Sequence, residues 1–254
     1  VDLAGEARWW SISGNPTSDG TMRGVMRDVT DSRKTEQRVA HMARYDTLSG
    51  LANRHLFNET LDDMLGRQVK NQQIALLYID LDHFKSVNDT LGHHIGDELI
   101  RVSAARLSGI VREHDLAARL GGDEFAVLLT RVSDLRTAHI CAQRIVDAMA
   151  EPFNLMGQTV RVSASVGVAY SPTRGLESEE FMRQADLALY AAKRAGRSTY
   201  ADFDASLNVQ ERTRRDLELD LRTAIAEGQF TLVYQPQVCL KTGKWTGKET
   251  LVRW

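Results

Sequence analysis

The spacing of hydrophobic positions changes several times along the chain, and each change marks a predicted element. Residues 74–82 read IALLYIDLD, a nearly continuous apolar run of strand length, which is typical of a central strand covered on both faces. Residues 159–170 alternate strictly, a pattern that predicts another strand. Residues 116–120 and 125–130 flank Gly121 and Gly122, so we expect a hairpin that turns at the two glycines.

Four further stretches carry apolar residues three or four positions apart, the spacing of one helix face. The four faces consist of Leu56, Phe57, Leu61, Met64 and Leu65; Ile95, Leu99, Val102 and Ala105; Ala138, Cys141, Ile145 and Ala148; and Phe181, Ala185, Ala188 and Ala192. The last helix should end near Gly196. The order is βαββαβα with antiparallel pairing, which predicts an α/β (α+β) domain with a central, mostly antiparallel sheet and flanking helices.

Both flanks of this core carry patterns of their own. Residues 7–13 and 22–30 are strand-like pieces around a turn-rich stretch, which indicates the last hairpin of a domain that begins earlier. Residues 31–44 predict a charged linker helix, which is either paired with its copy in a dimer or a solvated connector. We place the core domain at 45–204. A helix and a strand-like run follow within 205–254, a segment too short to bury a core of its own.

Composition narrows the classes of function. Hydrophobic residues make up 43% of the chain and charged residues 26%, as in an ordinary soluble domain. The formal net charge of −2 lacks a basic excess, so we expect no nucleic-acid partner. No apolar run approaches the roughly 18 residues of a membrane span, so we expect no membrane segment within this chain, although a parent protein could carry one elsewhere. Cys141 and Cys239 are isolated, which favours a reducing, cytoplasmic location.

Acidic residues gather at the ends of two predicted elements. Asp80 and Asp82 end the most apolar run and share one strand face, with Leu81 opposite. Alone, such a pair is more often a strand that emerges at the surface. Asp123 and Glu124, however, directly follow the glycine turn. If the apolar strand neighbours the first strand of the hairpin, carboxylates from both elements converge, as in proteins that hold Mg²⁺ and leave positions for water and substrate phosphates.

The segment after the apolar strand adds groups that suit a nucleotide. Lys85 and backbone amides at a strand-to-helix junction suit phosphates. Asn88 and Asp97 together offer the donor and the acceptor that a guanine edge requires, although singly they are more often turn and cap residues. Lys193 and Arg197 surround the end of the last helix, where cations also stabilise the helix dipole.

Five longer motifs follow one another along the chain. They are YDTLSGLANR at 45–54, DLDHFKSVNDTLGHHIGDE at 80–98, RLGGDEF at 119–125, SASVGVA at 163–169 and ADLALYAAKRAGR at 185–197. With these motifs the chain resembles the GGDEF diguanylate cyclases over most of the core domain. The resemblance implies a ferredoxin-like fold similar to the adenylate cyclase catalytic core. It also implies that the domain condenses two GTP into cyclic di-GMP and pyrophosphate.

The resemblance implies metal and catalytic roles for the acids. Asp80, the Leu81 carbonyl and Asp123 would bind Mg²⁺, with Mn²⁺ as the alternative ion. Asp123 or Glu124 would act as the general base for the 3′-hydroxyl of GTP, and Lys85 would stabilise charge in the transition state. The family accepts Asp or Glu at the position of Asp123, so the signature is intact.

The resemblance also implies the substrate contacts. The guanine and substrate-binding positions fall on Asn88, His93 and Asp97, and the phosphate-binding positions on Phe84, Lys85, Lys193 and Arg197. Each domain of the family holds one GTP, so catalysis requires two domains that face each other and implies a homodimer.

Arg112 and Asp115 stand where many relatives carry an inhibitory RxxD site for cyclic di-GMP. The guanidinium suits a phosphate or a guanine edge, and the carboxylate can accept from guanine N–H groups. A four-residue pattern is weak alone, and a surface ion pair is the alternative. The fixed offset from Gly121 favours the inhibitory site.

The flanks resemble two other signalling families. GVMRDVTDSRKTEQ at 24–37 is similar to the end of a PAS sensor domain, which would fill residues 1–30, running into a signalling helix. FTLVYQPQV at 230–238 and KETLVRW at 248–254 are similar to the beginning of an EAL phosphodiesterase, with Thr250 in place of the usual alanine. Glu249 would be a metal ligand there, but the other ligands are missing, so we expect no hydrolysis of cyclic di-GMP by this chain.

Two other functions remain open besides an active cyclase. One is a catalytically silent GTP-binding regulatory domain of a cyclic-di-GMP phosphodiesterase. The other is a cyclic-di-GMP receptor that relies on Arg112 and Asp115. Silent domains usually carry a damaged signature, whereas Asp80, Lys85 and the two acids of the turn are all present here, which favours the cyclase.

Overall fold

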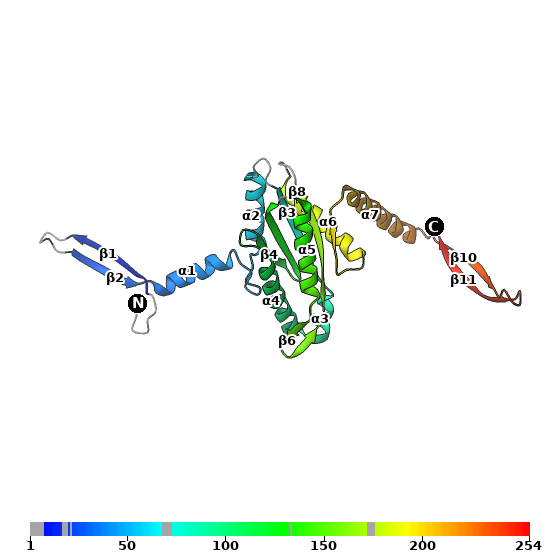
Figure 1. Ribbon diagram of the computed structural model, residues 1–254, viewed down its shortest axis with the longest axis horizontal. Coiled ribbons are helices and arrows are strands. Elements are labelled where there is room, and N and C mark those ends of the chain that lie inside the picture. Colours follow the sequence, from blue (N-terminus) through cyan, green and yellow to red (C-terminus); the bar gives the residue numbers. More distant parts are fainter. Residues whose placement is uncertain (1–7, 17–19, 21, 68–72, 133, 172–175) are drawn as a thin grey trace. The chain divides into compact units, whose positions relative to one another are not determined.

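The computed structural model describes residues 8–254 except for 17–19, 21, 68–72, 133 and 172–175 (Figure 1). The chain divides into two compact units, Val1–Phe203 and Asp204–Trp254. The first unit holds the central domain, preceded by a hairpin and a helix. The second unit holds a long helix and another hairpin.

A five-stranded sheet with the order β4-β5-β3-β8-β9 organises the central domain. Its strands are β3 (Gln73–Asp82), β4 (Leu116–Gly121), β5 (Glu124–Val132), β8 (Ser163–Ser171) and β9 (Tyr200–Asp202). Neighbouring strands are antiparallel except β8 and β9, which are parallel. The predicted mostly antiparallel sheet is therefore confirmed, and the most apolar run of the sequence, β3, lies at its centre.

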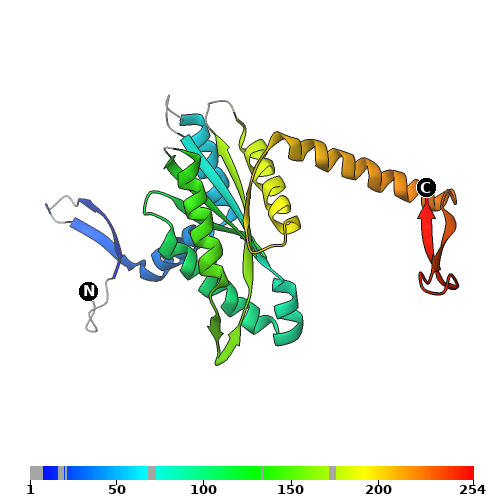
Figure 2. The same cartoon turned by 45° about the vertical axis from the view of Figure 1, so that its right-hand side comes forward.

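Helices cover both faces of this sheet (Figure 2). They are α2 (Arg54–Arg67), α3 (Phe84–Leu91), α4 (His93–Ile110), α5 (Leu135–Ala150) and α6 (Ser178–Arg194). Apolar side chains of α4 and α5 form one core with the sheet, and those of α2 and α6 form a second core on the opposite face. Leu77 and Ile79 of β3 enter the first core, whereas Leu76 and Tyr78 enter the second. This confirms the prediction that both faces of β3 are covered.

The close approach of α6 to β8 depends on Gly167. A Cβ added at Gly167 would overlap the carbonyl oxygen of Ala185 and the amide nitrogen of Leu189, which are backbone atoms of α6. Neither atom can move without shifting the helix. A residue without a side chain is therefore required where this strand and this helix meet.

The single strand predicted over residues 159–170 is in fact two strands. β7 (Gln158–Val160) pairs with β6 (Phe153–Leu155) in a separate two-stranded sheet, and β8 begins three residues later. The valines and alanines of the alternating pattern nevertheless share the α4–α5 core. An alternating pattern reports which side chains face a core, and here it continues across a break in the backbone pairing.

Two further expectations need correction. The strand next to β3 is β5, so β4 lies one position outward. The glycine turn still reaches the end of β3, because β5 begins there with Glu124 paired to Asp80. On α4, Ala105 is exposed, since ten residues at about 100° each place it about 80° around the helix from Ile95. The buried face continues instead through Leu107.

The flanking elements lie where the sequence predicts them. β1 (Trp10–Pro16) and β2 (Met22–Asp28) form an antiparallel hairpin, which α1 (Thr30–Met42) follows. In the second unit, α7 (Ala205–Ala226) precedes the hairpin of β10 (Thr231–Val238) and β11 (Trp245–Arg253). Every residue of β10 is exposed, so this hairpin buries no core of its own. Among the helices that the structure describes, none is both long and apolar enough to cross a membrane.

Candidate active site

The end of β3 and the β4–β5 turn meet at one edge of the sheet. The register pairs Asp80 with Glu124, and the amide nitrogen of Leu81 donates to the carbonyl oxygen of Asp123 at 3.3 Å. The two glycines of the turn have φ values of 145° and 53°, which residues with side chains rarely adopt. The predicted convergence of acidic residues from two elements is therefore present, although through β5 rather than β4.

Asp80 lies in a crowded electrostatic environment. Its Oδ2 is 2.7 Å from Nζ of Lys193 on α6, and 14% of its side chain is exposed. Burial raises the pKa of Asp80. The hydrogen bond and charge of Lys193 oppose this shift, the charges of Asp123 and Asp82 add to it, and the net shift is upward. A further cation beside these carboxylates would relieve their repulsion.

Asp82, unlike Asp80, does not reach solvent at the sheet edge. Its side chain is fully buried. Oδ2 accepts from Oγ of Ser163 at 2.6 Å and from the amide nitrogen of Ser198 at 3.1 Å, and Oδ1 accepts from Oγ of Ser165 at 2.8 Å. Nε of Arg197 lies 3.9 Å from Oδ1. Serines at alternate positions of the SASVGVA motif are the sequence signal for this buried cluster.

Glu124 belongs to a polar network that sequence reasoning missed. Its Oε2 accepts from the Tyr78 hydroxyl at 3.2 Å and lies 3.6 Å from Nη2 of Arg54. Burial and the charge of Glu124 raise the pKa of Tyr78, so this hydroxyl remains a proton donor. Arg54 also donates through Nε to the carbonyl of Leu120 at 2.9 Å. The available signals were a phenol inside an apolar strand and the arginine that ends YDTLSGLANR.

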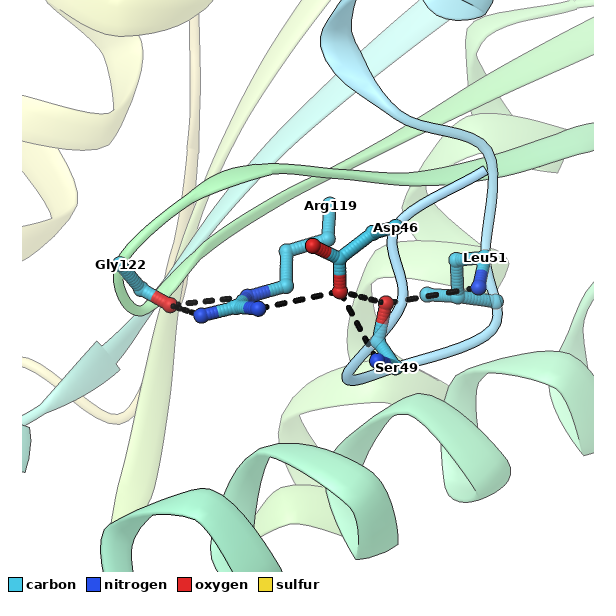
Figure 3. Close-up of polar contacts among 5 residues, drawn as sticks. All are labelled: Asp46, Ser49, Leu51, Arg119 and Gly122. Carbon is cyan, nitrogen blue, oxygen red and sulfur yellow. Dashed lines mark hydrogen bonds and ion pairs between the residues drawn. The ribbon is translucent and has the colours of Figure 1, made fainter. Parts of the chain in front are cut away.

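An arginine of the hairpin holds the glycine turn in place (Figure 3). Arg119 donates through Nε and Nη2 to the carbonyl of Gly122 at 3.0 and 2.8 Å, and its Nη1 lies 3.0 Å from Oδ1 of Asp46. The same carboxylate oxygen accepts from the amide and the hydroxyl of Ser49. Burial alone raises the pKa of Asp46, but the hydrogen bonds of Ser49 and Arg119 outweigh it and lower the pKa below its usual value.

The predicted guanine-binding residues lie on α3 and α4. The Asn88 side chain rests against Gly96, where an added Cβ would overlap its Oδ1. Asp97 follows Gly96 directly, and His93 precedes Asp97 by four residues, a spacing that places both on one side of α4. Both of these side chains are exposed. The structure thus places Asn88 against Gly96, the residue that directly precedes Asp97.

The predicted phosphate-binding residues lie at two helix ends. Phe84 and Lys85 begin α3 directly after β3. Phe84 packs against the α4–α5 core, so its side chain serves packing, whereas Lys85 is exposed. Lys193 lies in the last turn of α6 and Arg197 just beyond it, each beside one aspartate of β3. Ion pairs with Asp80 and Asp82, and not the helix dipole alone, therefore stabilise these two cations at their positions.

Arg112 and Asp115 lie before β4, a strand's length from the glycine turn. Only 4% of the Asp115 side chain is exposed, and its Oδ1 accepts from the amide of Thr130 at 2.8 Å and from its hydroxyl at 3.3 Å. Both residues line a cavity of about 130 Å³, together with Cys141 and Arg144 of α5. Burial raises the pKa of the Cys141 thiol to about 11, so this thiol stays protonated. The Asp115 carboxylate is thus mostly buried at this cavity, and its Oδ1 also lies 3.7 Å from Nε2 of the exposed His114.

The donor set at the sheet edge fits a divalent cation that shares its coordination with substrate. Within the ranges that the structure describes, no three His, Cys, Asp or Glu side chains form a metal-binding group. Asp80, Asp123 and the Leu81 carbonyl provide two carboxylates and one backbone oxygen at adjacent positions. Mg²⁺ is commonly bound by one or two carboxylates and completed by waters and phosphates, so a third acidic side chain is not required.

Comparisons of sequence agree with this geometry. The profile of the family described as "Diguanylate cyclase, GGDEF domain" matches residues 43–199. The signaling protein YkoW of Bacillus subtilis is 37% identical over 231 residues, which are 90% of this chain and 29% of YkoW. The cyclic di-GMP phosphodiesterase NbdA of Pseudomonas aeruginosa is 41% identical over 217 residues, which are 85% of this chain and 28% of NbdA. The chain thus spans less than a third of either relative.

Solved structures share the fold. The GGDEF domain of TpbB (YfiN) from Pseudomonas aeruginosa superposes with a TM-score of 0.64 and 37% identity, covering 66% of this chain and 99% of that domain. The coiled coil and GGDEF domain of DgcB from Caulobacter crescentus, in complex with c-di-GMP, gives a TM-score of 0.63 and 31% identity, covering 68% of this chain and 93% of that one. Both likenesses confirm the predicted fold class.

Proposed function

Since its residues 43–199 match the diguanylate cyclase profile, the chain belongs to the GGDEF family, and we propose that it condenses two molecules of GTP into cyclic di-GMP and pyrophosphate. The observation that carries this proposal is the meeting of Asp80, Asp123 and Glu124 at one sheet edge, with Lys193 bound to Asp80. Such a cluster of acids beside cations suits a metal ion and a triphosphate together.

In the proposed reaction the 3′-oxygen of each GTP attacks the α-phosphorus of the other, so two phosphodiester bonds form, two α–β phosphoanhydride bonds break and two pyrophosphates leave. Asp80, Asp123 and the Leu81 carbonyl would hold Mg²⁺ or Mn²⁺, and the bound ion would polarise the phosphate and lower the pKa of the attacking hydroxyl. Asp123 or Glu124 accepts the hydroxyl proton. Glu124 has a fixed orientation for this role because Tyr78 donates to one of its oxygens.

The same proposal assigns the substrate contacts. Lys85, Lys193 and Arg197 neutralise the triphosphate, with Lys85 placed to stabilise charge that develops during transfer. Phe84 contributes its backbone amide at the start of α3. Asn88, His93 and Asp97 bind the guanine end, and the contact of Asn88 with Gly96 supports this assignment because it orients the amide. One domain then holds one GTP, and two domains in a homodimer complete the reaction.

We also propose that Arg112 and Asp115 bind the product and inhibit the enzyme. Thr130 satisfies one carboxylate oxygen of Asp115, which leaves the other to accept from guanine N–H groups. The exposed guanidinium of Arg112 borders the same cavity and suits a phosphate. The cavity and the buried carboxylate of Asp115 support this proposal in addition to the resemblance.

The proposed activity is tested by incubating the chain with GTP and Mg²⁺ and separating the nucleotides by chromatography. We expect cyclic di-GMP from the unmodified chain and none from Asp123→Ala. Absence of cyclic di-GMP at high protein concentration would overturn the cyclase proposal. Equal product from Asp123→Ala would instead overturn the role of Asp123.

A silent regulatory domain is the second candidate, because the relative NbdA is named a cyclic di-GMP phosphodiesterase. In that case the chain binds GTP without forming product, and the regulated activity lies in a longer protein. We propose that such a protein carries a PAS-like sensor domain ending at residue 30, a signalling helix over 31–44, and an EAL domain that begins within 205–254. GTP binding by calorimetry without product would favour this candidate over the cyclase.

A further inference from the structure

The turn that follows α6 has an unusual backbone. Gly196, Arg197 and Ser198 have φ values of 119°, 64° and 50°. Two successive residues with side chains rarely adopt the left-handed region, and they do so only where surrounding contacts fix them. The next residue, Thr199, accepts through its carbonyl from the amide of Val166 at 3.0 Å, so the turn also sets where β9 joins the sheet.

The amide of Arg197 donates to the carbonyl of Ala192 on α6 at 3.2 Å, and Asp82 supplies the side-chain contacts to this turn. Its carboxylate accepts from the Ser198 amide and lies beside the Arg197 guanidinium. Two serines of β8 donate to it as well, Ser163 to Oδ2 and Ser165 to Oδ1. A fully buried carboxylate is costly unless donors satisfy it, and here three donors do. Asp82 therefore connects the α6–β9 turn directly to the two central strands.

We propose that Asp82 is a positioning residue, which holds the α6–β9 turn so that Arg197 can bind the triphosphate of GTP. This inference rests on the proposed cyclase function, which places the triphosphate beside Asp80 and Lys193. The Arg197 side chain is 47% exposed, so its guanidinium remains accessible to a phosphate while Nε lies beside Asp82. An arginine that is held on one side and open on the other is oriented for a charge-assisted contact.

The role of Asp82 differs from that of Asp80 although both lie on the same face of β3. Asp80 keeps part of its side chain exposed at the sheet edge, where Lys193 contacts it. The side chain of Asp82 has no exposed surface and therefore touches neither substrate nor metal. Its effect on substrate must pass through Arg197, which makes the two residues a testable pair.

The test measures the affinity for a GTP analogue with a non-cleavable α–β bridge, by calorimetry, in four chains: unmodified, Asp82→Asn, Arg197→Ala and the double variant. Asn keeps the shape of Asp82 but replaces one acceptor oxygen with a donor. We expect each single variant to weaken binding about tenfold, the scale of one charge-assisted contact. The double variant should bind as Arg197→Ala does, because coupled residues are not additive.

Three outcomes would overturn the inference: unchanged affinity in Asp82→Asn, unchanged affinity in Arg197→Ala, or losses that multiply in the double variant. Asp202→Asn on β9 is the matched control, since it removes an exposed carboxylate just after the turn and should bind the analogue normally. Thermal melting shows whether each variant is folded.

If Asp82→Asn does not fold, Ser163→Ala combined with Ser165→Ala loosens the carboxylate and keeps its charge. This variant should weaken binding about threefold, but not in the Arg197→Ala background; unchanged binding would again overturn the inference. Failure of the cyclase proposal is distinguishable, because it appears as missing cyclic di-GMP from the unmodified chain. Failure of the present inference appears only in the affinities of the variants.

Discussion

Burial of the ionised Asp80 carboxylate lowers the stability of the folded domain. Its carboxylate is mostly buried beside two other acids, and Lys193 only partly compensates, so its pKa is raised. Acids with a shifted pKa are frequent at functional sites. If Asp80 serves function at the expense of stability, its replacement should lower activity and raise stability.

We expect Asp80→Asn to lower cyclase activity by roughly 100-fold or more and to raise thermal stability at pH 7. The folded-state pKa of Asp80 lies above its unfolded value, so the stability linked to its protonated form is complete below the unfolded pKa and is lost as the pH rises through the folded pKa. The advantage of the variant should therefore shrink as the pH falls toward 4. Calorimetric melting across this range measures it, and a variant less stable at pH 7 would show that the Lys193 contact outweighs burial.

Arg112→Ala should relieve product inhibition and leave the initial rate nearly intact, because Arg112 lies before β4 and apart from the sheet edge. Loss of one charge-assisted contact should raise the inhibition constant for cyclic di-GMP at least about tenfold. Arg101→Ala is the control, since Arg101 is also exposed and its guanidinium forms an ion pair with Glu98, one helical turn away on α4. Unchanged inhibition in Arg112→Ala would reject the inhibitory site.

Site residues that lie in a sequence motif could be predicted from the sequence. Contacts that form only through the pairing of strands could not. Asp80, Lys193 and Arg197 were identified from the family pattern, and the structure brings them to one edge of the sheet. The network of Tyr78 and Arg54 around Glu124 was missed, because it requires knowledge that β3 pairs with β5 and that α2 covers this face. Spacing along one strand contains neither fact.

At the scale of elements, the β4–β5 turn is fixed by Arg119 of β4, whose guanidinium is in turn held by Asp46 outside the hairpin. We expect Arg119→Ala to lower the free energy of unfolding by about 1–3 kcal/mol, since it breaks hydrogen bonds to a charged, partly buried group. Arg44→Ala is the matched control: its ion pair with Glu59 is mostly exposed and should contribute little. Denaturant unfolding measures both, and equal effects would contradict the assigned role of Arg119.

The pH dependence of this contact has the opposite sign to that of Asp80. The pKa of Asp46 is lowered in the folded state, so its contribution is present above the unfolded pKa and is lost as the pH falls through the folded pKa. The stability difference between the unmodified chain and Asp46→Asn should therefore disappear in acid.

The contact of α6 with β8 gives a steric prediction. Gly167→Ala should destabilise the domain by about 3 kcal/mol, the scale of severe overpacking, because the new methyl group meets helix backbone. Gly109→Ala is the control, since it lies in α4 with open space around the added Cβ and should stabilise the helix by about 0.5–1 kcal/mol. Similar melting temperatures for the two variants would contradict the close approach.

The positions of helices and strands along the chain were predicted more reliably than the order of the strands in the sheet. The four helices predicted from apolar spacing and the hairpin lie where that spacing placed them, because it reflects local burial, whereas the short helix α3 was not predicted. The order β4-β5-β3 was not predicted, and neither was the short parallel strand β9, since strand order depends on contacts between distant segments. The break between β7 and β8 was hidden because the same core covers both sides of it.

At the scale of the whole molecule, the linker helix bears on how two domains meet. Val39 and Met42 of α1 are 61% and 59% exposed, and their spacing places them on one side of the helix. Apolar side chains left open on a charged helix favour pairing with a second copy. This supports the paired linker over the solvated connector, although the pairing itself remains a prediction.

If each domain holds one GTP, activity per chain must depend on protein concentration. We expect the initial rate per chain to rise with concentration and to level off once dimers predominate.

Val39→Glu with Met42→Glu should shift this curve to higher concentration without changing its plateau, because the substitutions weaken pairing and leave the sheet edge untouched. An excess of Asp123→Ala chain should also inhibit the unmodified chain, since mixed dimers carry one damaged site. A constant rate per chain across the range in which light scattering shows monomers becoming dimers would contradict catalysis across two domains.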